Sequence, residues 1–330
     1  MTALVRVSGL SGYSSLIESL GGDPQQLSRD CGIDLQVTRF EDALVPYRQI
    51  IHLMEHSATQ LKVPDLGLRL AAVQDVGILG PLAVAIQNAP TVERAIRCAA
   101  DFIFIQSPAL RLDFDKQGNQ TRLAIRIHLN NMTHAGMRQV EDLAIGLIHQ
   151  VLYMAAGDDY TLLKVELPHE PLCPPTVYEQ YFGAPVAFSK SDNAVFIDSK
   201  TLDTRMVERS AQLYQAAIDY LNVQQPAPDG RVAERVETAV RRTLGTDSCN
   251  RKDIAQAMGL HPRTLHRRLA REGVTFDQIR DGVCREMVEY YLCNTSAPLA
   301  QVAAIIGYAE QAVLSRNCRR WFGQPPREFR

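Results

Sequence analysis

The stretch NRKDIAQAMGLHPRTLHRRLAREG runs from Asn250 to Gly273, and SAPLAQVAAIIGYAEQAVLSRNCRRWFGQPPREFR runs from Ser296 to Arg330. Each stretch contains a short apolar segment, a turn with glycine and a second segment rich in arginine. This order predicts two helix-turn-helix units in tandem. Two such units at a fixed spacing indicate a protein that reads double-stranded DNA at two places.

Local signals set the limits of the first unit. Asn250 can cap a helix with Asp253 in a box-like position, and Gly259 supplies a left-handed stop. A second helix is expected to start near His261, with Pro262 in its first turn, where a missing N–H costs nothing. The buried face of the first helix is expected at Ile254, Ala257 and Met258.

The second helix of this unit carries a cluster of cations. Leu265 and Leu269 are expected to face inward. Three outward positions are spaced i, i+3 and i+4, as on a helix that reads a groove. These positions are Arg263, His266 and Arg267. Arg268 and Arg271 flank them and are better placed for phosphates.

A connector and a second unit follow. Thr275 and Gln278 form a capping box for a helix over residues 277–292, which would fix the distance between the units. The second unit should open at Pro298 and turn at Gly307. In its last helix, Leu314 and Cys318 should face inward, and Trp321 and Phe322 should close the small core. The outward residues are Gln311, Ala312 and Arg316 for bases, with Arg319 and Arg320 for phosphates.

Charge is divided unevenly along the 330 residues, although the net charge is only −2. Residues 231–330 hold 17 Lys and Arg against 11 Asp and Glu, whereas residues 1–230 hold 18 against 26. Sixteen of those 17 cations are Arg, whose planar fork suits phosphates and guanine edges. A basic C-terminal domain joined to an acidic N-terminal domain is therefore expected.

The N-terminal region mixes helical and strand periodicity, which predicts an α+β domain. Helices are expected over residues 13–20, 46–61, 65–73, 91–105 and 135–154. A hairpin is expected at residues 110–129 around the turn DKQGNQ, and shorter strands at 162–167, 186–188 and 194–197. The all-α C-terminal domain with its connector helix would follow.

A short heptad-like seam precedes a Pro-containing break, NVQQPAPDG. Within residues 206–221 the seam is formed by Met206, Ser210, Leu213, Ala217 and Tyr220. The helix either pairs two copies of the chain or packs on its own domain.

The segments RTLHRRLAREG, LAQVAAIIGY and RRWFGQPPREFR resemble the AraC/XylS family of bacterial transcription regulators. The resemblance implies that Arg263, His266 and Arg267, then Gln311, Ala312 and Arg316, read bases in adjacent major-groove segments. The segments DLGLRLA, GILGPLAVAIQNAPTVERAI and SPALRLDF are similar to the arabinose-binding-type regulatory domain of a VirS-like branch. This gives a ligand-responsive and dimerisation domain at 1–222, a linker at 223–230 and a DNA-binding domain at 231–330.

The sequence departs from the family pattern at three positions of the second unit. Leu314 and Cys318 stand where aromatic residues are common, and Ala309 stands where a Ser cap is usual. Smaller core groups and a lost cap each cost on the order of 1 kcal/mol, so we expect the second unit to be the less stable one.

Two other classes of protein compete with a regulator. One is an architectural DNA-binding protein, which would not need an acidic domain of this size. The other is an enzyme fused to a DNA-binding domain, with Cys173 as its nucleophile. The sequence contains no GxSxG, HExxH, Walker A or GxGxxG motif, and neither His52 with His56 nor His128 with His134 has a ligand partner at metal spacing. We therefore expect no catalytic residues, no cofactor and no metal.

The expected partners are promoter or operator DNA, RNA polymerase, a second copy of the chain and a small hydrophobic or amphipathic effector. An effector carboxylate could meet Arg69, Arg97 or Arg126, although a surface ion pair is the simpler explanation for each. Seven scattered cysteines, no apolar run near 18 residues and no signal-like segment indicate a cytoplasmic protein outside the membrane.

Overall fold

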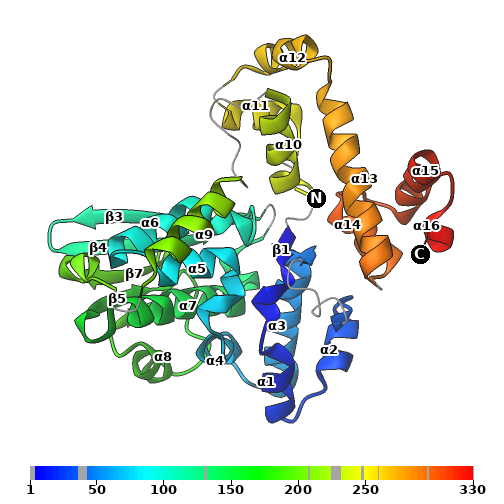
Figure 1. The fold of residues 1–330 in the computed structure, drawn as a ribbon. Helices are drawn as coiled ribbons and strands as arrows, with labels where there is room; N and C mark the ends of the chain where they lie inside the picture. Colours follow the sequence, from blue (N-terminus) through cyan, green and yellow to red (C-terminus); the bar gives the residue numbers. More distant parts are fainter. Residues whose placement is uncertain are drawn as a thin grey trace. The chain divides into compact units, whose positions relative to one another are not determined.

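The computed structural model describes residues 4–35, 43–129, 132–206, 209–223, 232–246, 249–258, 260–295 and 297–329 (Figure 1). The chain divides into two compact units. The N-terminal unit comprises Ser8–Ile33 and Gln49–Leu221. The C-terminal unit comprises Met1–Val7, Asp34–Arg48 and Asn222–Arg330.

A five-stranded sheet forms the centre of the N-terminal unit. Its strands, in spatial order, are β3 (Leu110–Gln117), β4 (Gln120–Ile127), β7 (Asn193–Asp198), β5 (Leu162–Glu166) and β6 (Val186–Ala187). Neighbouring strands are antiparallel except β5 and β6, which are parallel. The expected hairpin and the three expected strands at 162–167, 186–188 and 194–197 are present, and the α+β class is confirmed.

Helices make up most of the rest of this unit (Figure 1). They are α1 (Tyr13–Ser19), α2 (Pro24–Asp30), α3 (Tyr47–Leu61), α4 (Leu66–Val73), α5 (Pro81–Gln87), α6 (Val92–Phe102), α7 (Arg138–Ala156), α8 (Pro175–Phe182) and α9 (Ala211–Val223). Helices α4 and α7 pack so closely that only glycine fits at position 67. A Cβ on Gly67 would lie 2.1 Å from the carbonyl oxygen of Gln139. The five expected helices are present, the helix expected within residues 206–221 is α9, and α2, α5 and α8 are additional.

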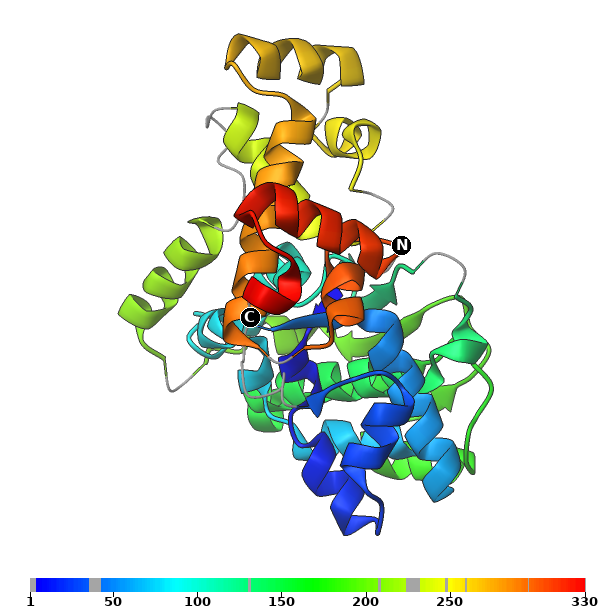
Figure 2. The same cartoon turned by 90° about the vertical axis from the view of Figure 1, so that its right-hand side faces the viewer.

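Seven helices form most of the C-terminal unit. They are α10 (Val232–Thr243), α11 (Arg251–Ala257), α12 (Pro262–Arg271), α13 (Phe276–Asn294), α14 (Leu299–Ile305), α15 (Gln311–Phe322) and α16 (Pro326–Phe329). Figure 2 shows α13 running from α12 at one end to α14 and α15 at the other. The two helix-turn-helix units, α11–α12 and α14–α15, therefore share one connector, as the sequence predicts.

Two very short strands complete the C-terminal unit. Strands β1 (Leu4–Arg6) and β2 (Leu44–Pro46) pair antiparallel, with Val5 opposite Val45, and we call the pair the N-terminal ribbon. β2 packs against α14. The sequence does not predict this ribbon. The expected linker lies outside the described residues apart from Val223, and Gly259 also lies outside them.

Candidate nucleic-acid interface

Side-chain caps hold the first helix-turn-helix unit in place. The Asn250 side-chain oxygen accepts a hydrogen bond from the Asp253 N–H at 3.0 Å, and its amide donates to the Asp253 carboxylate at 2.7 Å. At the start of α12, Nδ1 of His261 accepts a hydrogen bond from the Arg263 N–H at 3.3 Å. The N-terminal backbone donors of both helices are thus partly satisfied within the chain, and the predicted cap at Asn250 is confirmed.

Helix α12 has one buried stripe and one exposed polar face. Leu265 and Leu269 are at most 1% exposed, whereas the cations of the opposite face are exposed. These cations are Arg263, Arg267, Arg268 and Arg271, and the exposed imidazole of His266 lies among them. Within the described part of the chain they form no ion pair. A row of unpaired cations beside a small core provides the charge and access that DNA requires.

The connector α13 starts at a complete capping box. The Gln278 N–H donates to Oγ1 of Thr275 at 3.2 Å, and the Thr275 N–H donates to Oε1 of Gln278 at 2.8 Å. The helix contains 19 residues, so it is about 28 Å long at 1.5 Å per residue. This length is close to one turn of B-DNA, about 34 Å, which suits two reading helices placed in successive grooves.

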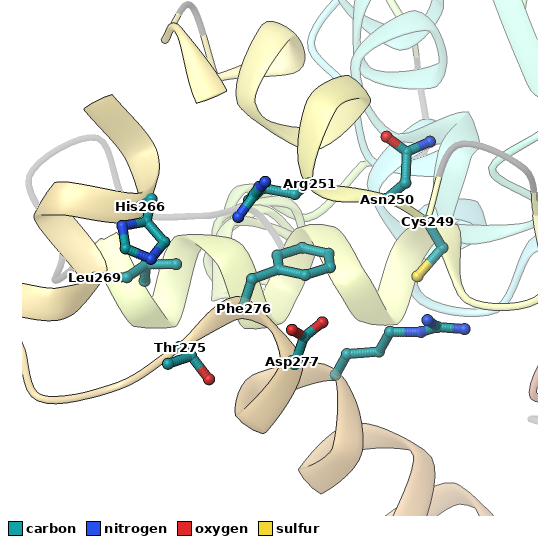
Figure 3. A pocket seen from close by; sticks show the side chains of 9 residues that line it. Cys249, Asn250, Arg251, His266, Leu269, Thr275, Phe276 and Asp277 are labelled. Carbon is teal, nitrogen blue, oxygen red and sulfur yellow. The ribbon is translucent and has the colours of Figure 1, made fainter. Parts of the chain in front are cut away.

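A hollow of about 420 Å³ lies beside the cationic face of α12 (Figure 3). Its lining includes His266, Phe276 and two arginines that the sequence analysis did not single out, Arg251 and Arg280. Figure 3 shows Arg251, His266 and Phe276 turned toward one another. Arg251 is the first residue of α11, and Arg280 lies near the start of α13.

Helix α15 repeats the design of α12 with fewer cations. Leu314 and Cys318 are fully buried, so the predicted inward face is confirmed. The exposed positions are Gln311, Ala312, Arg316 and Arg319. The cap residue is Glu310 rather than Ala309, and its side chain makes no capping hydrogen bond.

Arg320 lies in a different environment from the other arginines of α15. Its guanidinium pairs with Asp281 of α13, which also accepts a hydrogen bond from Nε1 of Trp321 at 3.0 Å. Phe322 stacks on Phe329 at 4.3 Å between ring centroids. Trp321 and Phe322 therefore close the small core as expected, whereas Arg320 already has an anionic partner within the protein.

Each of the three arginines considered for an effector carboxylate forms an ion pair on the N-terminal unit. Arg69 contacts Asp65 at 2.9 Å, and Arg97 contacts Glu93 at 2.7 Å. Arg126 pairs with two carboxylates, which are Asp113 and Asp192. The structure does not bring these arginines to a common cavity, and each of the three side chains is accounted for by an ion pair.

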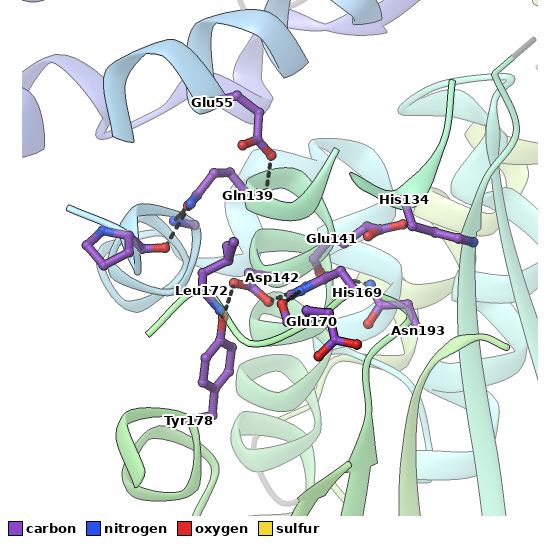
Figure 4. Close-up of polar contacts among 12 residues, drawn as sticks. Glu55, His134, Gln139, Glu141, Asp142, His169, Glu170, Leu172, Tyr178 and Asn193 are labelled. Atoms are coloured by element: carbon purple, nitrogen blue, oxygen red, sulfur yellow. Dashed lines mark hydrogen bonds and ion pairs between the residues drawn. The ribbon is translucent and has the colours of Figure 1, made fainter. Parts of the chain in front are cut away.

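The N-terminal unit contains a buried polar cluster that the sequence pattern does not predict (Figure 4). Asp142 accepts a hydrogen bond from the hydroxyl of Tyr178 at 3.0 Å and lies 3.1 Å from Nε2 of His169. Nδ1 of His169 lies 2.8 Å from the carbonyl oxygen of Glu170. Burial alone would lower the pKa of His169, but these two acceptors outweigh it and raise the pKa. The cluster ties α7 to α8 and to the segment that precedes α8.

The features expected of an enzyme do not assemble. Burial raises the pKa of the Cys173 thiol to about 11, the opposite of what an activated nucleophile needs. No group of three or more His, Cys, Asp or Glu side chains among the described residues could hold a metal ion. In the same residues, no helix combines the length and apolar character needed to cross a membrane.

Comparisons with known proteins agree with this geometry. Residues 21–206 match the arabinose-binding domain of the AraC transcription regulator, N-terminal part, and residues 254–330 match a helix-turn-helix domain. The HTH-type transcriptional regulator VirS of Mycobacterium tuberculosis is 30% identical over 328 residues, which cover 99% of this chain and 96% of VirS.

More distant relatives come from Pseudomonas aeruginosa. The HTH-type transcriptional regulator VqsM is 22% identical over 263 residues, or 78% of this chain and 80% of VqsM. The crystal structure of the transcriptional regulator CdpR aligns with a TM-score of 0.47 and 19% identity, covering 92% of this chain and 96% of CdpR. The matched family models and the sequence relatives VirS and VqsM describe regulators rather than enzymes. The chain therefore belongs to the AraC family of DNA-binding transcription regulators.

Proposed function

We propose that this regulator reads an asymmetric operator with α12 and α15 in two successive major grooves of double-stranded DNA. The supporting observation is the pair of helices, each with a buried stripe and an exposed polar face, on one capped connector. Because the two exposed faces differ in sequence, the two half-sites should differ as well. In this proposal the base-reading residues are Arg263, His266, Arg267, Gln311, Ala312 and Arg316.

Phosphate contacts are proposed for Arg268 and Arg319, which are exposed and flank the reading faces. Arg320 can contact a phosphate only after it leaves Asp281, so we assign it a lesser role in binding DNA. This division separates residues that position the protein from residues that read sequence.

We propose a homodimer that pairs through α9. Leu213 is 53% exposed and Tyr220 is 50% exposed, and they lie seven residues apart on one side of the helix. Ala217 and Leu221 are buried, and Met206 precedes the helix and is buried too. Some residues of the expected seam are therefore buried within the chain, and its exposed large apolar residues are Leu213 and Tyr220, which can contact a partner.

We also propose an amphipathic effector for the N-terminal unit. A hollow of about 730 Å³ there combines apolar Met154 and Met206 with charged Asp158, Asp159 and Arg205. Such a lining favours a ligand with both apolar and charged parts. A regulator of this kind would act in the cytoplasm, where it meets promoter DNA and RNA polymerase.

Selection of binding sites from random duplex DNA, followed by hydroxyl-radical footprinting, tests the proposed operator. We expect an asymmetric sequence of roughly 20 base pairs per protomer, with two protected groove segments on one face. Protection of a single groove segment would overturn the two-groove reading. Salt-dependent binding with no sequence preference would favour the architectural alternative instead.

A further inference from the structure

The N-terminal ribbon has no role in the function proposed above. Its strands contain three residues each, and a two-stranded ribbon of that length is not stable in water. Yet Val5 and Val45 are at most 4% exposed. The ribbon is therefore held by what it packs against, and within the C-terminal unit this includes α14 and one side chain of α13.

The side chain from α13 is Tyr291. Its hydroxyl accepts a hydrogen bond from the Leu44 N–H at 2.7 Å and donates to the Leu44 carbonyl at 3.2 Å. Leu44 pairs with Arg6 across the ribbon, and at this position both of its backbone groups point away from β1. One hydroxyl thus satisfies the free edge of β2, an edge that would otherwise lack partners.

Burial makes this contact specific. Tyr291 is 1% exposed, and burial raises the pKa of its hydroxyl, so the group stays neutral and able to donate. A hydroxyl buried to this degree needs hydrogen-bond partners. Both of these hydrogen bonds are to Leu44, a residue 247 positions earlier in the chain. The connector helix of the DNA-reading unit thus recognises the backbone of an N-terminal strand.

Helix α14 contributes an apolar surface and one buried side chain, Gln301, whose hydrogen-bonding groups are unsatisfied within the described part of the chain. Val302 and Ile305 are fully buried. Gln301, on the same helix, is only 4% exposed, and neither polar atom of its side chain has a partner among the described residues. An unsatisfied buried amide costs free energy, so the packing of α14 is not at its stability optimum.

The strands of the ribbon lead directly into the N-terminal unit. β2 ends at Pro46 and α3 begins at Tyr47, while a 3-10 helix starts at Val7 directly after β1. Further along α3, Ile51 and Met54 are buried in the core of the N-terminal unit. A shift of α3 within its own unit would therefore pull on β2.

We propose that the N-terminal ribbon is a docking segment that holds α14 against the connector through Tyr291, so that the N-terminal unit controls the second helix-turn-helix. The predicted effect on DNA binding rests on the proposed function, whereas the contact of the ribbon with α14 and Tyr291 does not depend on it. The first helix-turn-helix unit, which α10 packs against, is outside this control.

Hydrogen exchange on the full-length protein without DNA tests the docking. Tyr291→Phe removes only the hydroxyl, and we expect exchange of the β2 and α14 amides to become about tenfold faster. Amides of α11 and α12, and of α6 and α7, should keep their rates. Tyr153→Phe is the matched control, because it removes the hydroxyl of a tyrosine that is 60% exposed. This substitution should change none of these exchange rates.

A second variant approaches the same contact from the other side. Deletion of residues 1–6 removes β1 without altering any side chain of the DNA-reading helices, and it should reproduce the exchange pattern of Tyr291→Phe. Unchanged exchange in β2 and α14 in both variants would overturn the proposal. Equal acceleration across α6, α7, α12 and α14 would also overturn it, because Tyr291 would then be an ordinary core residue.

Footprinting of the same variants tests the control of DNA reading. Tyr291→Phe should lose protection over the half-site of α15 by about tenfold while keeping protection over the half-site of α12. Equal weakening of both half-sites would contradict control of one unit. If the wild-type protein bound no specific DNA, the proposed function would fail, while the exchange data would still decide whether the ribbon docks.

Discussion

Nε1 of Trp321 donates a hydrogen bond of 3.0 Å to Asp281 and thereby joins the last turn of α15 to the connector α13. The same carboxylate pairs with Arg320. Helix α15 is thus oriented by one acidic residue of the connector, in addition to the buried Leu314 and Cys318. The orientation of α15 should depend on the hydrogen bond more than on the ion pair, since the ion pair is exposed.

Two substitutions of Asp281 separate these contributions. Asp281→Asn keeps an acceptor for Trp321 and should leave the free energy of unfolding within about 0.5 kcal/mol of the wild type. Asp281→Ala removes that acceptor and should cost about 1 kcal/mol. Urea unfolding, followed by the fluorescence of Trp321, the only tryptophan, measures both values. An equal loss in the two variants would show that the charge of Asp281 matters instead.

Base reading and phosphate binding should respond differently to loss of an arginine. Arg267→Ala and Arg316→Ala should each weaken specific binding by about 1–3 kcal/mol and relax the preference at one base position. Arg319→Ala should weaken binding to all sequences alike and reduce the salt dependence. Titrations on operator and scrambled DNA at several salt concentrations distinguish the two patterns. Uniform loss in all three variants would contradict the assignment of base readers.

Elements specified by neighbouring residues could be predicted from the sequence. The capping box of Thr275 and Gln278 depends on residues three apart, and the buried stripe of α12 depends on helical periodicity. The hairpin β3–β4 joins two alternating segments through a turn with Gly118 in a left-handed conformation. In each case the interacting residues lie close together in the chain, so the local pattern carries the information.

Contacts between distant segments could not be predicted. The N-terminal ribbon pairs Val5 with Val45, in strands too short for alternation to show. Asp142 and His169 meet only because α7 and the segment before α8 fold together. Likewise, nothing in the sequence near Arg320 reveals that Asp281, 39 positions earlier, neutralises it. These pairings depend on tertiary packing, which overrides local pattern.

The proposed dimer predicts that one side of α9 is sensitive to charge. Leu213→Glu should place a carboxylate in an apolar interface and shift the protein toward monomer, with weaker operator binding and unchanged folding. Gln212→Glu is the matched control, since Gln212 is exposed on the adjacent position and adds the same charge beside the interface. Sedimentation velocity gives the oligomeric state. A monomeric wild type, or a Leu213→Glu variant that sediments as the wild type does, would remove α9 from the proposal.

The burial of His149 predicts that the folded protein loses stability in mild acid. Its Nδ1 lies 3.0 Å from the hydroxyl of Tyr160, its ring also contacts Tyr181 and Phe182, and burial lowers its pKa from 6.5 to about 4. Between these two pH values the unfolded chain binds a proton that the folded chain does not, so this residue makes folding less favourable as the pH falls.

The His149→Gln variant isolates that effect. Between about pH 7 and pH 5, the free energy of unfolding should fall less in the variant than in the wild type, by on the order of 1 kcal/mol. His169, whose pKa is raised, acts in the opposite direction, but it is common to both proteins and cancels in the comparison. Urea unfolding at the two pH values gives the difference. Parallel losses in wild type and variant would mean that His149 is protonated in the folded protein at the same pH as in the unfolded chain.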